Sequence, residues 1–353
     1  MQQEYWGWDI GGAHLKWARM SANGQVMSVT MLPCPLWQGI EVLRNALREA
    51  LGAVPANTRV VHGVTMTGEL VDAFQSREDG VVRILEQFTN EVAGEDVQVY
   101  ALPGVLCSVE QAIRQSNRVA SANWHAAATA AAVIGRSGLL IDVGSTTTDV
   151  IAFSDGEVRI DGRDDAERLR SGELVYTGCV RTPLMALVER VPYNGEWQTV
   201  AAEYFATMAD VYRVLERLPD NADMMDTADG GEKTVTASAR RIMRMLGRDL
   251  EAHARGAHVQ LCRYLASRQL EQIRVAAHQV LSRIAAESTP TILVGAGVGR
   301  FLLPQLAAEL QLDYRDFSGL LVDNNDAALH TQVNDCAPAA AVAHLMQSAS
   351  SAA

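Results

Sequence analysis

One stretch alternates apolar and polar segments in a pattern that predicts two strands joined by a tight turn. Residues 139–143 (LLIDV) form a short apolar run, and residues 149–153 (DVIAF) form another. Gly144 and four hydroxyl residues, 145–148, lie between the two runs. A glycine between apolar runs of this length is typical of a strand, a turn and a second strand. A polar hairpin turn with a single buried aspartate stays open as the alternative.

Two other apolar runs lead into glycine turns. Residues 5–9 precede Gly11-Gly12 and a returning apolar run at 15–18, which predicts a second hairpin of the same plan. Residues 291–294 run into 295–299 (GAGVG), and a helix is expected beyond that turn. The two hairpins predict two similarly built α/β halves that face each other across a cleft.

The remaining periodicity predicts further elements. Helices are expected at 40–51, 69–74, 81–92, 120–134, 199–215, 236–246, 258–287, 301–311 and 338–347, and strands at 59–65, 97–102 and 157–161. Residues 164–172 are expected to be a charged loop or short helix, 219–233 an acidic loop, and the final SASSAA a frayed end. We expect domain I at 1–135 plus 330–353, and domain II at 136–329.

Composition excludes several classes of protein. The 353 residues are 48% hydrophobic and carry a net charge of −12, which predicts a soluble globular chain and argues against nucleic-acid or anionic-membrane partners. Five scattered cysteines without a C-x-x-C pair argue against a zinc site or disulfide framework. The sequence shows neither a signal peptide pattern nor a membrane-length apolar run, so a cytoplasmic location is expected.

The central turn has the composition of a phosphate site. Gly144 lets the backbone approach a ligand, and consecutive N–H groups with adjacent hydroxyls make a cradle for phosphate oxygens. Asp142 and Asp149 would repel such a ligand unless a divalent cation lay between them and the phosphates. We therefore interpret the turn as a metal-polyphosphate site. Because the first two turns lead from strand to strand, a dinucleotide-binding fold is disfavoured.

The three turns together resemble those of the superfamily of acetate and sugar kinases, heat-shock chaperones and actin, over nearly the whole chain. The first phosphate loop of that superfamily, D-x-G-x-x-x-x-K, is matched by Asp9, Gly11 and Lys16; the second is matched by Asp142, Gly144, Thr146 and Asp149; and the adenosine loop is matched by Gly295 and Gly297. Ala13-His14 departs from the small hydroxyl residues often found in the first loop. The resemblance implies a two-domain, actin-like (ribonuclease H-like) α/β fold with a central cleft.

Four other sequence segments resemble one branch of that superfamily. Residues 66–74 (MTGELVDAF), 121–126 (SANWHA), 227–231 (TADGG) and 244–249 (RMLGRD) are similar to hydantoinase/oxoprolinase-related proteins linked to tetrahydromethanopterin one-carbon metabolism. That resemblance implies a transferase of methanofuran or methylofuran biosynthesis. The expected reaction joins an aminomethylfuran-methyl diphosphate to the phenol of γ-glutamyltyramine, or of a tyrosine analogue, as an ether and releases diphosphate.

Under this hypothesis the turn residues take specific roles. Asp9 and Asp142 hold Mg²⁺ directly or through water, Lys16 contacts the phosphates, and Asp149 braces the second turn. The other expected binding residues are Gly11, Gly12, Gly144, Ser145, Thr146, Thr147, Gly295 and Gly297. The base that accepts the phenol proton is left open among Asp142, His14 and Glu69.

Two other functions stay open at this point. One is an ATP-dependent small-molecule kinase or hydantoinase/oxoprolinase-like ATPase, which would use ATP or ADP in the adenosine loop. The other is a non-catalytic, nucleotide-binding regulator with a protein partner. A homodimer also stays open.

Several single residues have a functional and a structural interpretation. Trp6, Trp8 and Trp17 could stack on an aromatic substrate or belong to the core, and His125 could line the cleft or pack at a helix start. Arg181 could bind a substrate carboxylate, such as that of a glutamyl group, or form a surface salt bridge. For Cys179 we favour an inert small residue over a nucleophile. The acidic loop is either a lid over the site or a solvent-exposed loop without a role in binding.

Overall fold

The computed structural model describes residues 2–55, 57–220, 222–284 and 288–352. These residues form two compact units. Unit 1 comprises 1–140, 151–159 and 315–353, and unit 2 comprises 141–150 and 160–314. The chain passes between the units within the strands β7 (Gly138–Val143), β8 (Thr148–Ser154) and β14 (Asp313–Asp316), and between residues 159 and 160. The domain boundaries expected from sequence stay a prediction.

A six-stranded sheet forms the centre of unit 1. Its order is β3-β2-β1-β4-β5-β6. The strands are β1 (Gln2–Ile10), β2 (His14–Ser21), β3 (Val26–Pro33), β4 (Thr58–Met66), β5 (Asp96–Ala101) and β6 (Val105–Ser108). The strands β1, β2 and β3 pair antiparallel, whereas β4 and β5 run parallel to β1. The hairpin predicted around Gly11-Gly12 is therefore the β1–β2 connection.

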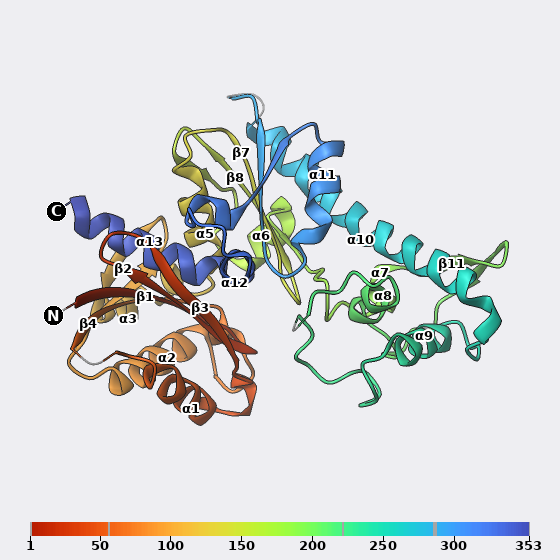
Figure 1. Ribbon diagram of the computed structural model, residues 1–353, viewed down its shortest axis with the longest axis horizontal. Helices are drawn as coiled ribbons and strands as arrows, with labels where there is room; N and C mark the ends of the chain where they lie inside the picture. The colour runs from red at the N-terminus through yellow and green to blue at the C-terminus, as the bar shows by residue number, and fades with distance from the viewer. Residues whose placement is uncertain (1, 56, 221, 285–287, 353) are drawn as a thin grey trace. The chain divides into compact units, whose positions relative to one another are not determined.

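Helices cover both faces of this sheet (Figure 1). The long C-terminal helix α13 (Ala337–Ala352) lies directly on β1 and β4, because Gly7 and Gly63 have no side chain to hold it away. The opposite face packs against α1 (Ile40–Leu51) and α2 (Arg77–Glu91), whose apolar positions enter one core with the sheet. The remaining helices of this unit are α3 (Val109–Arg114), α4 (Ser116–Val119), α5 (Asn123–Ala132) and α12 (Ala327–Asp335).

The second sheet repeats the strand order of the first. Its order is β10-β8-β7-β13-β14, with β9 (Glu157–Arg159) also paired to β8. The other strands are β10 (Leu174–Val175) and β13 (Ile292–Ala296). In the first sheet β1 lies between its hairpin partner β2 and β4, and in the second sheet β7 lies between its hairpin partner β8 and β13. In each case the third strand follows much later in the sequence. This order is that of the ribonuclease H-like fold, so the predicted fold class and the repeated hairpin plan are confirmed.

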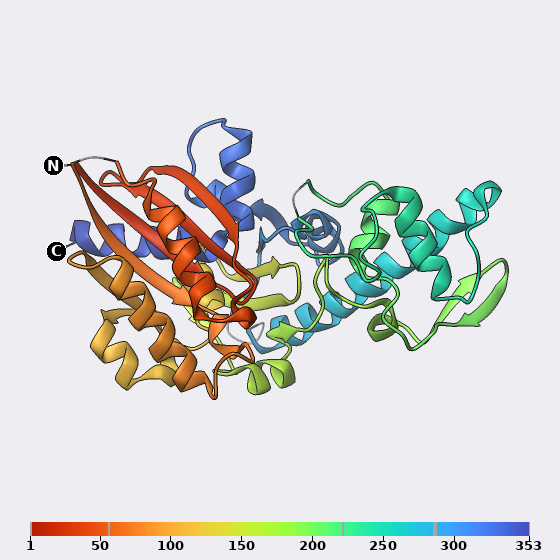
Figure 2. The same ribbon diagram turned by 90° about the horizontal axis from the view of Figure 1, so that it is seen from below.

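A segment of loops, short helices and one hairpin in unit 2 packs along α10 (Arg255–Ile284), as Figures 1 and 2 show for the green segment. This segment contains α7 (Leu184–Leu187), the hairpin β11 (Arg190–Tyr193) and β12 (Glu196–Thr199), α8 (Met208–Val214) and α9 (Val235–Arg244). Unit 2 also contains α6 (Asp165–Ser171) and α11 (Leu303–Glu309). None of the helices in the described ranges is long and apolar enough to cross a membrane.

Three predicted elements are wrong. The expected helix at 69–74 is only a short 3-10 turn, Gly68–Leu70, because Gly68 packs against the carbonyls of Ile10 and Gly11. The expected helix at 199–215 begins only at Met208. The C-terminal residues expected to fray continue α13 to Ala352. Part of the helix predicted at 258–287 lies outside the described residues, at 285–287. Residue 221 of the predicted acidic loop and residue 353 of the expected frayed end also lie outside them.

The tryptophans of the first hairpin are core residues, which confirms the structural interpretation of these side chains over stacking on a substrate. Trp6 and Trp8 are fully buried, and Trp17 stacks on Trp8 with ring centroids 5.8 Å apart. His62 lies among these rings and accepts a hydrogen bond at Nδ1 from Trp8 Nε1, at 3.0 Å. Burial lowers the pKa of His62 from 6.5 to about 4. The imidazole is therefore neutral in the folded protein at neutral pH.

We predict that His62 makes unit 1 sensitive to acid. Its folded pKa is depressed, so its contribution to stability is fully present above pH 6.5 and is lost as the pH falls toward 4. Between pH 7 and pH 4 the wild type should lose about 3 kcal/mol more stability than His62→Gln, which keeps an acceptor for Trp8. Urea unfolding followed by tryptophan fluorescence measures this difference. An equal loss in both proteins would contradict the prediction.

Candidate functional site

The first turn in unit 1 places a buried carboxylate beside a lysine. Asp9 is the penultimate residue of β1, is 2% exposed and lies opposite Lys16 in the β1–β2 pairing. Lys16 Nζ is 3.5 Å from Asp9 Oδ2, and Asn123 Nδ2 donates to Asp9 Oδ1 at 3.3 Å. Thr65, opposite Asp9 on β4, is fully buried, and its hydroxyl has no hydrogen-bond partner within the described ranges. The turn therefore holds one charged pair with polar groups around it.

The segment after β4 supports the same turn. Thr67 N donates to the carbonyl of Ile10 at 3.0 Å, so the two chain segments lie against each other at the end of the sheet. Glu69 is buried, and its carboxylate accepts a hydrogen bond from Ser121 Oγ at 2.7 Å. This burial makes Glu69 a poor candidate for the base that accepts the phenol proton.

The second turn in unit 2 has the form of an anion cradle. Gly144 N donates to Thr147 O at 2.9 Å, which closes the turn between β7 and β8. Within the part of the chain that the structure describes, no acceptor is found for the backbone N–H groups of Ser145, Thr146 and Thr147. The hydroxyls of Ser145 and Thr146 lie 3.5 Å apart beside these groups. Consecutive N–H groups of this kind bind anionic oxygens.

A neighbouring segment packs backbone to backbone on this turn. Cys179 N donates to the carbonyl of Gly144 at 3.0 Å, and Arg181 N donates to the carbonyl of Ser145 at 2.8 Å. A side chain at Gly178 would overlap the Ser145–Thr146 peptide. The chain from 178 to 181 thus fixes the shape of the turn. Cys179 is fully buried, which fits a packing residue rather than a nucleophile.

The third glycine turn packs on the carboxylate that precedes the second turn. Gly297 has φ +83°, and a Cβ there would overlap both Asp142 Oδ1 and the carbonyl oxygen of Val143. Gly299 N donates to that same carbonyl at 2.8 Å. The glycines therefore let the third turn approach Asp142 closely, and this role needs no nucleotide.

Asp149, expected to brace the second turn, forms an ion pair with Arg168. Arg168 is 2% exposed and also donates to the carbonyl of Glu173 at 3.2 Å. The carboxylate of Asp149 is thus held by a buried cation of its own unit. Its charge is balanced locally.

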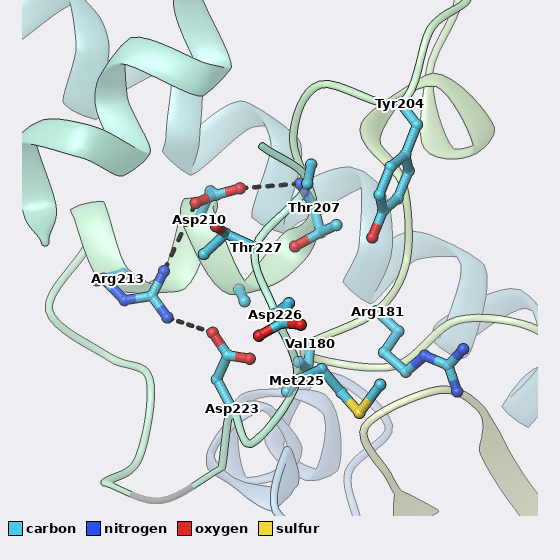
Figure 3. A pocket seen from close by; sticks show the side chains of 12 residues that line it. Val180, Arg181, Tyr204, Thr207, Asp210, Arg213, Asp223, Met225, Asp226 and Thr227 are labelled. Carbon is cyan, nitrogen blue, oxygen red and sulfur yellow. Dashed lines mark hydrogen bonds and ion pairs between the residues drawn. The ribbon is translucent and has the colours of Figure 1, made fainter. Parts of the chain in front are cut away.

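A pocket of about 100 Å³ opens beside the second turn within unit 2 (Figure 3). Its lining residues are Val180, Arg181, Tyr204, Thr207, Ala209, Asp210, Arg213, Asp223, Met225, Asp226, Thr227 and Ala228. Val180 and Arg181 belong to the segment that packs on the turn, since both backbone N–H groups donate to Ser145 O. The pocket and the cradle therefore share a wall.

The acidic loop forms part of this pocket and is held by ion pairs at two points. Asp223 pairs with Arg213 and also lies 3.6 Å from Lys233 Nζ. Asp229 pairs with Arg241 at 3.1 Å and with Arg244 at 3.0 Å. Partial burial raises the pKa of Asp229, but the Gly231 N–H and Arg241 outweigh it and lower that pKa below its usual value. The stretch between these anchors, 225–228, lines the pocket.

His125 is not part of either turn. It is 3% exposed, and its Nδ1 lies 2.7 Å from the hydroxyl of Tyr100. Of the two interpretations of His125, the structure supports packing at the start of α5. Arg181 makes no ion pair among the residues described, so the predicted surface salt bridge is absent there.

Several pocket residues were missed from the sequence because 199–215 was predicted as one helix. Tyr204, Thr207 and Asp210 lie in or just after the loop that precedes α8. The spacing of Thr207 and Asp210 is that of a capping box, and Thr207 N donates to Asp210 Oδ2 at 3.1 Å. This signal could have placed the helix start correctly.

Comparison with known proteins identifies the family. The sequence profile of the hydantoinase/oxoprolinase family matches residues 60–319. The chain therefore belongs to the hydantoinase/oxoprolinase family, which confirms the resemblance found in the sequence.

Two relatives carry the same enzyme name. The chain is 29% identical over 343 residues to (4-{4-[2-(gamma-L-glutamylamino)ethyl]phenoxymethyl}furan-2-yl)methanamine synthase of Methanocaldococcus jannaschii, with 97% of each chain covered. It is 37% identical over 117 residues to the synthase of that name from Methanococcus vannielii, covering 33% of this chain and 52% of that protein.

Among solved structures, a ROK family glucokinase from Streptomyces griseus matches with a TM-score of 0.46 and 12% identity over 97% of this chain and 98% of that one.

The contact between Gly297 and Asp142 gives a test of the site. Gly297→Ala should lose about 1–3 kcal/mol more stability than Gly195→Ala. Both glycines have a left-handed backbone, with φ +83° and +84°, but a Cβ at Gly195 meets nothing within 4 Å. The difference therefore isolates the overlap with Asp142 and Val143. Thermal or urea unfolding of both variants measures it, and equal losses would show that the third turn does not press on Asp142.

Proposed function

We propose that this chain is the transferase that makes the furan–phenol ether of methanofuran or a related furan cofactor. The observation that carries the proposal is the full-length match to a synthase whose name describes that ether product. The proposed donor is an aminomethylfuran-methyl diphosphate, and the proposed acceptor is the phenol of γ-glutamyltyramine.

In the proposed reaction the phenol oxygen forms a bond to the furan methylene carbon. The bond from that carbon to the diphosphate oxygen breaks, and the diphosphate leaves with the electron pair. The electron-rich furan ring stabilises positive charge on the methylene as this occurs. The phenol proton passes to a base. Asp142 and His14 are the remaining candidates for this base, because Glu69 is buried.

The second turn of unit 2 is proposed to hold the leaving diphosphate. The N–H groups of residues 145–147 and the hydroxyls of Ser145 and Thr146 offer hydrogen bonds to oxygens that gain negative charge during the step. A rigid turn is useful here, because donors already in place need not reorganise as charge develops. The backbone contacts from Gly178 and the 178–181 segment supply that rigidity.

Magnesium is part of this proposal. No group of three His, Cys, Asp or Glu side chains within the described ranges could hold a metal on its own. Mg²⁺ commonly binds through one or two carboxylates together with phosphate oxygens and water, so Asp142 beside the cradle suits it. When bound, it would neutralise part of the charge on the diphosphate. A contribution from Asp9, which belongs to unit 1, stays a prediction.

The kinase or ATPase alternative drew its support from the glycine-rich third turn. Gly297 and Gly299 pack on Asp142 and Val143, so these glycines have a structural role whether or not a nucleotide binds. The contact neither requires nor excludes a nucleotide. ATP or ADP therefore stays the alternative cofactor beside Mg²⁺.

The experiment is an incubation of the purified protein with Mg²⁺, the furan-methyl diphosphate and γ-glutamyltyramine, without nucleotide. Mass spectrometry should detect the ether, and a coupled assay should detect an equal amount of diphosphate. Asp142→Asn should lower kcat/KM by at least about 100-fold, since the removed charge lies beside the cradle. Asp249→Asn, which changes an exposed carboxylate, is the matched control and should keep wild-type activity.

No ether, together with hydrolysis of ATP in a parallel assay, would overturn the proposal and favour the ATPase. Ether formation that Asp142→Asn leaves unchanged would keep the transferase but remove Asp142 from the site.

A further inference from the structure

We infer that the pocket beside the second turn binds the zwitterionic γ-glutamyl end of the acceptor. This inference rests on the proposed function and adds to it the residues that select the acceptor. The γ-glutamyl group carries a free α-carboxylate and a free α-ammonium, so a site that recognises it needs one cation and one anion that are not already neutralised.

Most charged groups of the pocket are neutralised by each other. Asp210 accepts from Arg241 Nε at 2.9 Å and from the backbone N of Thr207 at 3.1 Å. Arg213 pairs with Asp223 and lies 3.5 Å from Asp210. These three residues form one side of the pocket, as Figure 3 shows for Asp210, Arg213 and Asp223. Together with Arg241 they comprise two carboxylates and two guanidiniums that pair with one another, so they shape the pocket.

Two charged groups remain. Arg181 and Asp226 line the pocket and are exposed, and neither forms an ion pair with any residue that the structure describes. The guanidinium of Arg181 has only a long contact of 3.5 Å, from Nη1 to Thr146 Oγ1. A planar guanidinium suits a carboxylate, because it can donate two parallel hydrogen bonds. Asp226 offers the opposite charge for an ammonium group.

The pocket also has a surface for an aromatic ring. Tyr204 lies on the same side as Arg181 in Figure 3, and the residue is 44% exposed. An exposed phenol ring provides a flat apolar face on which the ring of tyramine could stack. Because Arg181 also contacts the second turn, an acceptor held here lies next to the proposed diphosphate site within the same unit.

The experiment compares acceptors that differ in one charge. The wild type should use γ-glutamyltyramine with a kcat/KM roughly 10- to 100-fold above that of its α-carboxamide analogue, which lacks the carboxylate. In Arg181→Met this ratio should fall to about 1, while kcat/KM for the carboxamide stays within about 3-fold of wild type. Asp226→Asn should likewise remove the preference for γ-glutamyltyramine over its N-acetyl analogue, which lacks the ammonium.

Two matched variants control for a general loss of surface charge. Arg240→Met and Asp220→Asn change exposed residues of unit 2 that do not line the pocket, and both should keep the wild-type ratios. If Arg181→Met lowers kcat/KM equally for both acceptors and raises KM for the furan diphosphate, Arg181 serves the cradle and the inference is overturned.

Calorimetry separates a failure of this inference from a failure of the proposed function. If the wild type makes no ether from any acceptor, the proposed function fails. The pocket is then tested by binding of γ-glutamyltyramine alone, which should be lost in Arg181→Met and kept in Arg240→Met. Absence of binding to the wild type would overturn the inference, whereas ether formation with no discrimination among acceptors would overturn it and leave the proposed function standing.

Discussion

Close backbone packing around the second turn is the constraint on which the rest of the candidate site depends. Gly178 lies against the Ser145–Thr146 peptide, and Gly297 lies against Asp142 and the Val143 carbonyl, so a side chain at either position would overlap the turn. Three segments far apart in the sequence are thereby joined without side chains between them. The result is a turn held in one shape, with its N–H groups available to an anion.

The same packing connects the turn to the pocket. The segment that begins at Gly178 continues into Val180 and Arg181, and its backbone also accepts a hydrogen bond from Ala209 N at the start of α8. A change in the turn would therefore move one wall of the pocket. Residues 225–228 of the acidic loop complete the other wall, and the pairs of Asp223 with Arg213 and of Asp229 with Arg241 and Arg244 hold them in place. The proposed donor and acceptor sites are thus built from one continuous set of contacts.

Local patterns predicted much of this fold. The helix α1 begins and ends at the predicted residues, 40 and 51, because its apolar spacing is regular over three turns. Both hairpins were found because glycine between apolar runs is a local signal. The prediction of a single helix at 199–215 was wrong, because tertiary contacts hold the residues before Met208 as a loop. One of these contacts is the hydrogen bond from Ala201 N to Met245 O, at 2.8 Å. The pocket could not be predicted, since its residues meet only after α8, α9 and the acidic loop have packed.

In the proposed reaction the phenol oxygen attacks carbon rather than phosphorus. A single turnover with γ-glutamyltyramine labelled with ¹⁸O in the phenol distinguishes the two. We expect all of the label in the furan–phenol ether and none in the released diphosphate. Label in an aryl phosphate would show that the phenol attacks phosphorus, as in a kinase, and would overturn the proposed reaction.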